Sequence, residues 1–437
     1  MSVFTKLYFV VALVSFLLVV FTLRKAKPLH TFTAMFFVLH TLVAEHPIIH
    51  MIWQLGLTLL ALSLGTLDTS LGQYGLALFM LSWLGKLFLL TQSAAAGSVL
   101  HQALLKGLGS DYRQRIPADR LAVLNQAVTA DHLLKPFSFK RDNVTVQKDI
   151  CYGDEKYGNR NLLDIYSTTQ TTNTPRPVLL SVHGGGWIMG TKGHDAQPLL
   201  HHMASLGWVC VAINYRLSPK ATFPEHIIDV KRAIMWVKQN IHEYGGDPEF
   251  VAIVGGSAGG HLSSLAVVSA NKKEWQPGFE SVDTSLQAGV HNYGVYSFVS
   301  EGAESFVKQS EKLFTRHIFK QSRQDNPLLW EQASPDSYIN AALGKTLPPM
   351  FFIHGSHDTT VPPDFSRQFF ERLKDAKHRA LVYAELPYAK HGYDVTQSLR
   401  GGQALDAVAE FLEWSYARYK NQVVADSSIE SIPSNNS

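Results

Sequence analysis

A glycine-rich turn after an apolar run restricts the fold of this chain more than any other stretch. Residues 250–254, FVAIV, have the length and composition of a buried strand, and GGSAGG follows directly at 255–260. Glycine loses more conformational freedom on folding than any other residue, so four glycines in six positions indicate a backbone path that side chains would block. A helical pattern comes next. The sequence therefore predicts a strand that turns sharply into a helix, with Ser257 at the turn.

Residues 255–259 have the G-x-S-x-G pattern of a nucleophile elbow. In such a turn the neighbours of the serine must lack side chains, and the hydroxyl is held above the sheet edge at the amino terminus of the helix. One other interpretation is a glycine-rich turn with an incidental serine. Another is a phosphate-binding loop, but no Lys-Ser or Lys-Thr pair follows and the GxGxxG spacing does not fit. We predict that Ser257 is a nucleophile.

A second glycine-rich loop, HGGGW at 183–187, follows an apolar run at 178–182. A tetrahedral intermediate needs backbone N–H donors where its negative oxygen forms. Glycines suit such a loop because a side chain would block the acyl group. We expect the N–H groups of Gly185, Gly186 and Ala258 to form an oxyanion hole.

The serine also needs a base, and the base needs a group that orients it. Chains with a nucleophile elbow carry the order serine, acid, histidine, with the acid just beyond a late strand. Asp358 fits this order because it follows the apolar run at 350–354. Asp364 is a weaker candidate, since it lies beyond two prolines.

His391 is the expected base, because it follows the next apolar run at 381–386. The chain has 19 histidines, so a histidine alone indicates little. His354 and His357 precede the acid, which is the wrong order along the chain.

Apolar runs and amphipathic helical patterns alternate between residues 144 and 420. The helical patterns include 225–245 and 404–419. Alternation of this kind predicts an α/β fold with right-handed crossovers and a largely parallel sheet. The expected strands are 144–151, 162–166, 178–182, 209–215, 250–254, 350–354 and 381–386.

Five short motifs together resemble the hormone-sensitive-lipase-like branch of the α/β-hydrolases: HGGGW, NYRLSP, GGSAGGHLSSLA, HGSHDTTVP and AKHGYD. The longer stretches 227–266 and 275–298 are similar to membrane-associated bacterial carboxylesterases typified by the mycobacterial Lip enzymes. The resemblance covers roughly residues 145–417. One departure is YRLSPK at 215–220, where family members often carry YRLAPE.

This resemblance implies an α/β-hydrolase fold, a Ser257–His391–Asp358 triad and a carboxylic ester as substrate. It implies no metal and no cofactor. Arylformamidases share the HGG-type loop and the triad, so hydrolysis of N-formylkynurenine is one alternative function. A hydrolase-fold binding module without chemistry is another, although such proteins usually lose the serine or the histidine.

Three apolar runs precede the α/β region, at 7–23, 48–66 and 71–90, and only Lys86 interrupts them. Each is close to the length that spans a bilayer, whereas a fourth stretch at 31–44 is short for a span. A signal peptide is the competing interpretation of the first run, but its apolar core is long and no small-residue cleavage site follows. We expect residues 1–92 to be a membrane anchor of three or four helices.

The side of the membrane depends on the number of spans. Arg24, Lys25 and Lys27 mark a cytoplasmic loop by the positive-inside tendency. Three spans then place the rest of the chain in the cytoplasm, and four place it outside. Together with the resemblance, the runs imply a multi-pass protein of the bacterial inner membrane.

The remaining chain divides into a helical linker or cap at 93–143, a catalytic domain at 144–420 and a polar, disordered tail at 421–437. The catalytic domain contains every expected catalytic part. We therefore expect it to fold, and to hydrolyse short soluble esters, without residues 1–92.

The composition of the chain restricts the kinds of molecule that it is expected to bind. The net charge is +3 and evenly spread, which argues against a nucleic-acid partner. The two cysteines, Cys151 and Cys210, make neither a disulfide framework nor a metal site. The expected partners are a carboxylic ester, with lipid-like esters among the candidates, and the lipid bilayer. The sequence predicts no oligomeric state.

Overall fold

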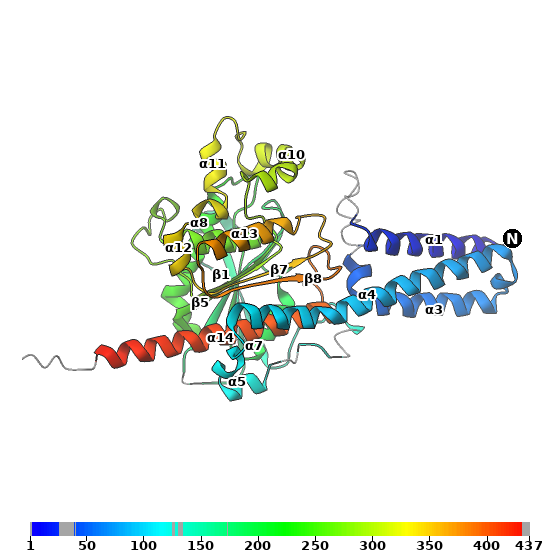
Figure 1. Cartoon of the computed structure of the whole chain (residues 1–437), viewed down its shortest axis with the longest axis horizontal. Helices are drawn as coiled ribbons and strands as arrows, with labels where there is room; N and C mark the ends of the chain where they lie inside the picture. The colour runs from blue at the N-terminus through cyan, green and yellow to red at the C-terminus, as the bar shows by residue number, and fades with distance from the viewer. Residues whose placement is uncertain are drawn as a thin grey trace, which may run out of the picture.

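A computed structural model of the chain describes residues 2–25, 39, 41–124, 127–129, 134–172 and 174–430. Figure 1 shows a bundle of long helices that projects from one side of an α/β body. The bundle contains the amino-terminal apolar runs, and the body contains the predicted strands.

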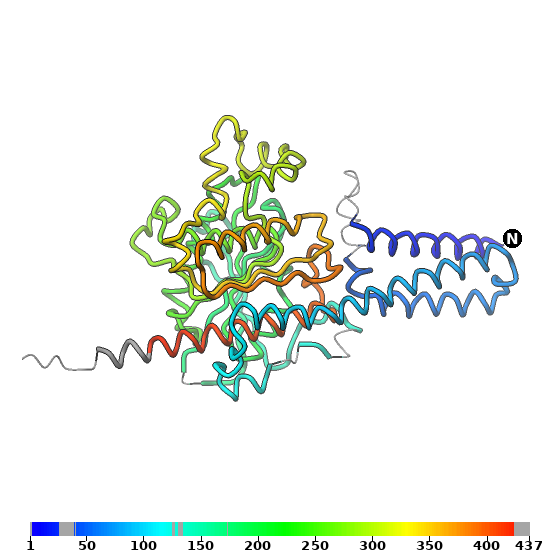
Figure 2. The backbone as a smooth tube through the Cα atoms, viewed as in Figure 1, coloured from blue at the N-terminus to red at the C-terminus, as the bar shows by residue number. Residues whose placement is uncertain are grey.

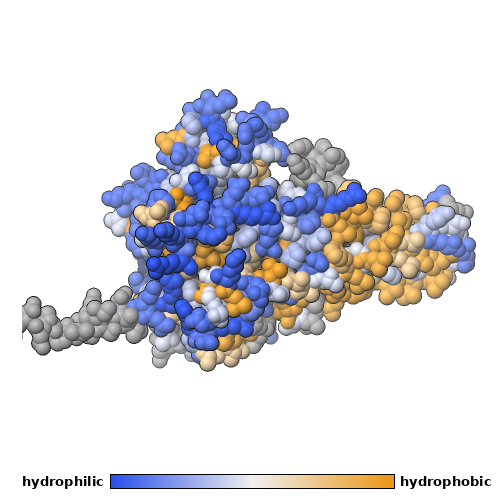
Figure 3. Space-filling model, in the orientation of Figure 1, coloured by the Kyte–Doolittle hydropathy of each residue, from blue (hydrophilic) through white to orange (hydrophobic). Residues whose placement is uncertain are grey.

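Among the described residues, the bundle is formed by the helices α1 (Val3–Leu23), α3 (Pro47–Ser63) and α4 (Ser70–Leu108). α1 packs closely on α4 because glycines lie between them: a Cβ at Gly75 would be 2.8 Å from the Tyr8 ring, and one at Gly85 would be 2.3 Å from Val19. Large apolar side chains are exposed on the outside of all three helices, and they form the apolar surface that Figure 3 shows over the bundle.

By length and composition, α1 and α4 could each cross a membrane, and α3 is a shorter apolar helix of 17 residues. Helices of this kind also occur as signal sequences or as buried core helices. The fourth candidate run, 31–44, lies largely outside the described residues.

The body is built on one eight-stranded sheet with the order β1-β2-β4-β3-β5-β6-β7-β8. β1 and β2 pair antiparallel with their neighbours, and the remaining strands are parallel. Every predicted strand is present, and β6 is one that the sequence pattern does not predict. The strands are β1 (Val144–Cys151), β2 (Leu162–Thr168), β3 (Arg176–Val182), β4 (Val209–Ile213), β5 (Gly246–Gly256), β6 (Ala288–Asn292), β7 (Met350–Gly355) and β8 (Leu381–Leu386).

Each face of the sheet is covered by helices, which buries successive residues of a strand in two different cores. On β3, Leu180 belongs to the core under α8 (Glu225–Asn240), α9 (Ala258–Val268) and α13 (Asp364–Asp375). Its neighbour Leu179 belongs to the opposite core, under α7 (Gln197–Ser205), α14 (Leu399–Glu430) and the second half of α4.

The remaining helices lie in the connections. They are α5 (Ala118–Ala122), α10 (Glu304–Leu313), α11 (Pro327–Gln332) and α12 (Ala341–Thr346), with short turns η1 (Thr66–Asp68), η2 (Tyr112–Arg115), η3 (Glu155–Asn161), η4 (Ile241–Tyr244), η5 (Lys273–Trp275), η6 (Glu301–Ala303), η7 (Phe314–Ile318) and η8 (Pro335–Tyr338).

Two helices extend beyond the expected boundaries. α4 runs without a break past residue 92 to Leu108, and Leu100 and Leu104 pack in the core beside α14 and β8. Figure 2 follows this helix from the bundle into the body. α14 continues to Glu430, into the expected tail, and residues 431–437 lie outside the described residues. Sequence composition changes near residue 92, but the helix does not end there because its apolar face continues.

Candidate active site

Ser257 lies in a sharp turn between β5 and α9, with φ 58° and ψ −120°. The glycines around it are required by close backbone contacts. A Cβ at Gly255 would be 2.2 Å from the carbonyl oxygen of Gly259, and one at Gly259 would be 2.0 Å from that of Val182. The strand–turn–helix expected from residues 250–268 is therefore present. A non-glycine residue at positive φ carries backbone strain, which is typical of functional turns.

Three side chains from separate turns meet at this point. His391 Nε2 is 2.8 Å from Ser257 Oγ, and His391 Nδ1 is 2.6 Å from Asp358 Oδ2. Asp358 follows β7 directly, and His391 lies in the segment 387–398 between β8 and α14, which we call the histidine loop. If Nδ1 donates to the carboxylate, Nε2 is left to accept a proton from the serine.

The buried Asp358 carboxylate is held in its ionised form. Burial raises its pKa, but the charge of His391 and hydrogen bonds from His391 and His354 outweigh burial, so the pKa lies well below its usual range. Its other oxygen accepts hydrogen bonds from the N–H groups of Thr360 at 2.8 Å and Val361 at 2.9 Å. These contacts fix the carboxylate toward the histidine.

The second acid candidate lies elsewhere. Asp364 begins α13, is exposed, and pairs with Arg367 at 2.8 Å. The structure therefore brings Asp358, and not Asp364, to His391.

The predicted oxyanion loop lies against the nucleophile. A Cβ at Gly184 would be 3.3 Å from Ser257 Cβ, and the Gly184 N–H donates to Asp195 Oδ2 at 2.5 Å. Gly185 and Gly186 have φ of 106° and 61°, and a Cβ at Gly185 would be 2.2 Å from the Met189 carbonyl oxygen. Within the described residues, no acceptor takes the N–H of Gly185, Gly186 or Ala258. Three donors are thus left for a bound anion.

Sequence reasoning set His354 aside because it precedes the acid. In the structure its Nε2 is 3.2 Å from Asp358 Oδ2 and 2.9 Å from the Val361 carbonyl oxygen, while its Nδ1 is 2.7 Å from Ser366 Oγ. Chain order excludes it as the base, but its place four residues before the acid could have indicated a supporting contact.

Sequence reasoning missed Tyr293 and Asp394. The Tyr293 ring lies 4.6 Å from the His391 ring, and its hydroxyl donates to Asp394, which also accepts from Asn292 Nδ2 at 2.9 Å. Burial, followed by the charge of Asp394, raises the pKa of Tyr293 well above its ordinary value, so the hydroxyl remains protonated. Tyr293 follows β6 directly, and its position could be recognised only once that strand was known.

The segment before α3 contacts the histidine loop and the first turn of α14. These contacts argue against the expectation that the catalytic domain is independent of residues 1–92. They join Thr41 Oγ1 to the His391 carbonyl oxygen (3.4 Å), His46 Nε2 to Thr396 Oγ1 (2.8 Å), Ser398 Oγ to Glu45 Oε2 (2.9 Å) and Arg400 to Glu45.

Known proteins resemble this chain over most of its length. Residues 163–373 match the protein family described as BD-FAE. The probable carboxylic ester hydrolase LipM of Mycobacterium tuberculosis is 42% identical over 382 residues, which cover 84% of this chain and 86% of LipM. Esterase LipQ of the same organism is 40% identical over 333 residues, covering 74% of this chain and 76% of LipQ.

A solved esterase from the fungus Rhizomucor miehei matches in fold, with a TM-score of 0.54 at 21% identity, over 71% of this chain and 96% of that chain. The likeness to LipM and LipQ extends over more than two thirds of both relatives. The chain therefore belongs to the Lip-type carboxylic ester hydrolases, which are serine hydrolases of the α/β-hydrolase fold.

Proposed function

We propose that Ser257, His391 and Asp358 are the catalytic triad of a membrane-anchored serine carboxylesterase. One observation carries the assignment: two hydrogen bonds of 2.8 and 2.6 Å join the three side chains in the order serine, histidine, acid. The strained backbone at Ser257 and the family of the chain support it.

The proposed reaction proceeds through an acyl-enzyme. Ser257 Oγ attacks the ester carbonyl carbon while His391 Nε2 takes the hydroxyl proton. Asp358 holds the imidazole in the correct tautomer and stabilises the imidazolium. The proton then passes to the leaving alkoxide oxygen, so the alcohol departs. A water molecule, deprotonated by His391, attacks the acyl-enzyme and releases the carboxylic acid.

Gly185, Gly186 and Ala258 form the proposed oxyanion hole. Donors that are fixed before the reaction stabilise the negative oxygen without reorganisation, and one such donor is typically worth about 10²–10³ in kcat. Support comes from the three N–H groups, which have no acceptor among the described residues.

The helices α1, α3 and α4 are the proposed membrane anchor. Their exposed apolar side chains support this, and Figure 3 shows the apolar surface that they form over the bundle. Lys390 Nζ donates to the Arg24 carbonyl oxygen at 3.4 Å. The carboxyl end of α1 therefore lies at the end of the bundle that meets the body. Arg24 and Lys25 then favour a cytoplasmic body on three spans.

The test combines labelling with a substrate panel. A fluorophosphonate probe should label the full-length protein and fail to label Ser257→Ala. p-Nitrophenyl esters of increasing acyl length should be hydrolysed, and N-formylkynurenine should be a poor substrate. Labelling that survives in the Ser257→Ala variant would contradict the triad, whereas a preference for N-formylkynurenine would favour arylformamidase activity.

The anchor is tested separately. The full-length protein should remain in the membrane pellet after a carbonate wash at high pH. Release into the supernatant would show that the three helices do not span the bilayer.

A further inference from the structure

The surface of the body has a groove, and a basic and aromatic loop forms one of its walls. Its volume is about 530 Å³, and its walls are residues 135–140 on one side and Gly193, Gln197 and His201 on the other. Lys135 and Lys140 lie at the two ends of the loop segment, with Phe137 between them. No aspartate or glutamate lines the groove within the part of the chain that the structure describes.

The loop lies at the base of the helical bundle. The Pro136 carbonyl oxygen accepts a hydrogen bond from the Gln397 N–H at 2.9 Å. Thr396, the neighbour of Gln397, bonds His46 at 2.8 Å, and His46 is the residue that precedes α3. Two contacts therefore connect the loop to the point where the bundle meets the body. A bilayer that surrounds the bundle would have its surface at this point, next to the loop.

The loop exposes apolar side chains near the point where the bundle meets the body. Leu134 is 56% exposed and Phe137 is 67% exposed. An exposed aromatic ring next to lysines is typical of segments that lie at the boundary between lipid head groups and acyl chains.

The groove also has the chemistry of an anion site. His201 is only 6% exposed, and its Nδ1 has no hydrogen-bond partner among the described residues. Burial, followed by the charges of Arg141 and Lys140, lowers the pKa of His201 to about 4, so the imidazole is neutral in a positive environment. The charges of Arg141 and Lys140 that act on His201, and the lack of a carboxylate in the groove lining, make the groove a favourable place for an anion.

We infer that this groove binds the phosphate head group of a membrane phospholipid, with Phe137 and Leu134 in the adjacent acyl region. This inference rests on the proposed membrane anchor. An anionic lipid such as phosphatidylglycerol should bind better than a zwitterionic lipid, because each lysine near a negatively charged surface adds to the attraction. The loop would fix the height and tilt of the body above the bilayer.

The first experiment measures where the loop lies. The full-length protein, with Cys151→Ser and Ser257→Ala to remove the exposed thiol and lipid hydrolysis, carries Phe137→Cys with an environment-sensitive fluorophore. It is reconstituted into phosphatidylcholine vesicles with and without phosphatidylglycerol, and lipids with brominated acyl chains serve as quenchers. Leu328→Cys is the matched control, since Leu328 is 59% exposed and lies on α11, away from the bundle (Figure 1).

We expect quenching at position 137 and none at 328. A fluorophore at 137 that is no better quenched than one at 328, in protein that resists the carbonate wash, overturns this inference and leaves the anchor standing. Release by carbonate overturns the anchor itself, so the two failures are distinguishable.

The second experiment tests the head group. Detergent-solubilised protein with the same fluorophore is titrated with short-chain phosphatidylglycerol, short-chain phosphatidylcholine or inorganic phosphate. Phosphatidylglycerol should bind best, and Lys140→Gln should weaken it about fivefold. Equal binding of phosphatidylcholine, tighter binding of inorganic phosphate, or an unchanged Kd in the Lys140→Gln variant would overturn the assignment.

Discussion

Glu45 and Arg400 form an ion pair in which neither side chain is exposed to solvent. Glu45 lies in the segment before α3, two residues ahead of that helix, and Arg400 lies in the first turn of α14. Arg400 also donates to the Pro387 carbonyl oxygen at 3.2 Å, so it holds the beginning of the histidine loop next to its end. The segment before α3 thus supports the backbone that carries His391.

Glu45→Gln should slow catalysis more than it weakens substrate binding. The change leaves the Arg400 charge buried without a counter-charge, which is costly, and the histidine loop should shift to relieve it. A displacement of about 1 Å at a catalytic group can cost about 10²-fold in rate. We expect kcat, and the rate of fluorophosphonate labelling, to fall by about this factor while KM changes little.

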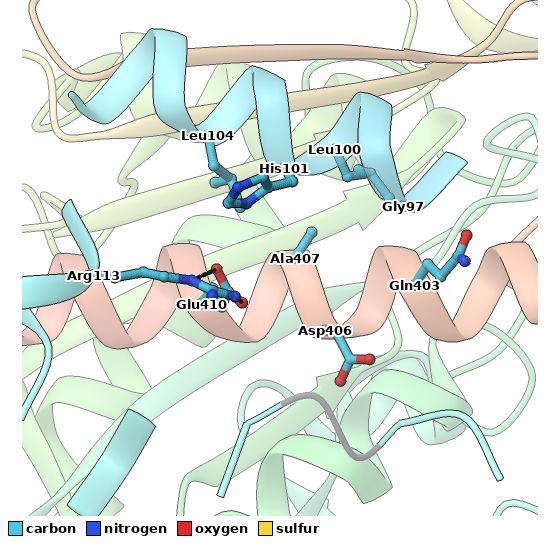
Figure 4. A pocket seen from close by; sticks show the side chains of 9 residues that line it. All are labelled: Gly97, Leu100, His101, Leu104, Arg113, Gln403, Asp406, Ala407 and Glu410. Atoms are coloured by element: carbon cyan, nitrogen blue, oxygen red, sulfur yellow. Dashed lines mark hydrogen bonds and ion pairs between the residues drawn. The ribbon is translucent and has the colours of Figure 1, made fainter. Parts of the chain in front are cut away.

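Glu410→Gln is the control for that variant. Glu410 on α14 also pairs with an arginine from the preceding chain, Arg113, but beside a pocket between α4 and α14 and not at the histidine loop (Figure 4). The control should lower the melting temperature and leave kcat of the folded protein nearly unchanged. Equal losses of kcat in both variants would show that Glu45 has only a general structural role.

Ser257→Ala should abolish ester hydrolysis. Loss of the nucleophile in a serine hydrolase costs about 10⁶-fold in kcat, and loss of the histidine base costs about as much. His391→Ala should therefore be comparably severe in a p-nitrophenyl butyrate assay. A His391→Ala variant with near-normal turnover would show that another residue is the base.

The acid is tested by a pair of variants. Asp358→Asn should lower kcat about 10⁴-fold, because an amide favours the wrong tautomer of the imidazole. Asp364→Asn should have little effect, since Asp364 is exposed and pairs with Arg367. The reverse ranking in steady-state kinetics would assign the acid to Asp364.

Removal of residues 1–92 should inactivate the enzyme even toward short soluble esters. The deletion takes away Glu45, Thr41 and His46, and it leaves Arg400 buried without its partner. It also cuts α4 in its middle. Activity of the truncated protein toward p-nitrophenyl acetate is the measurement. Normal activity would restore the expectation of an independent catalytic domain.

Lys231 should make stability depend on pH in the alkaline range. Its ammonium group is buried on α8, bonds the Ser269 carbonyl oxygen, and lies 3.4 Å from Thr284 Oγ1. Burial, with a further contribution from Lys272, lowers its pKa from 10.5 to about 7. Between these values the unfolded chain binds a proton that the folded chain does not, so stability rises as the pH rises.

Lys231→Met removes that proton linkage. The melting temperature of the unmodified protein, relative to that of the variant, should increase from pH 7 to pH 9. The variant should be the more stable of the two at pH 7, because no ammonium group has to be desolvated or deprotonated. Parallel pH profiles would show that Lys231 does not titrate in this range.

The sequence by itself predicted the local parts of the site. These parts are the turn at Ser257, the HGGGW loop and the strands before Asp358 and His391. Each can be recognised from the sequence because its pattern depends on residues only a few positions apart. Their order along the chain then indicated which residues would meet, since parallel strands end at the same edge of a sheet. In the structure, two hydrogen bonds join the side chains of Ser257, His391 and Asp358 in that order.

Only the tertiary structure decided what surrounds these parts. β6 carries His291 and Asn292 in a short run, so its pattern is too polar for a buried strand, and Tyr293 was missed with it. The contact of Glu45 with Arg400 joins residues 355 positions apart, and no local pattern encodes such a pairing. The pair is kept from water because the segment before α3 packs against the start of α14 and leaves neither side chain exposed.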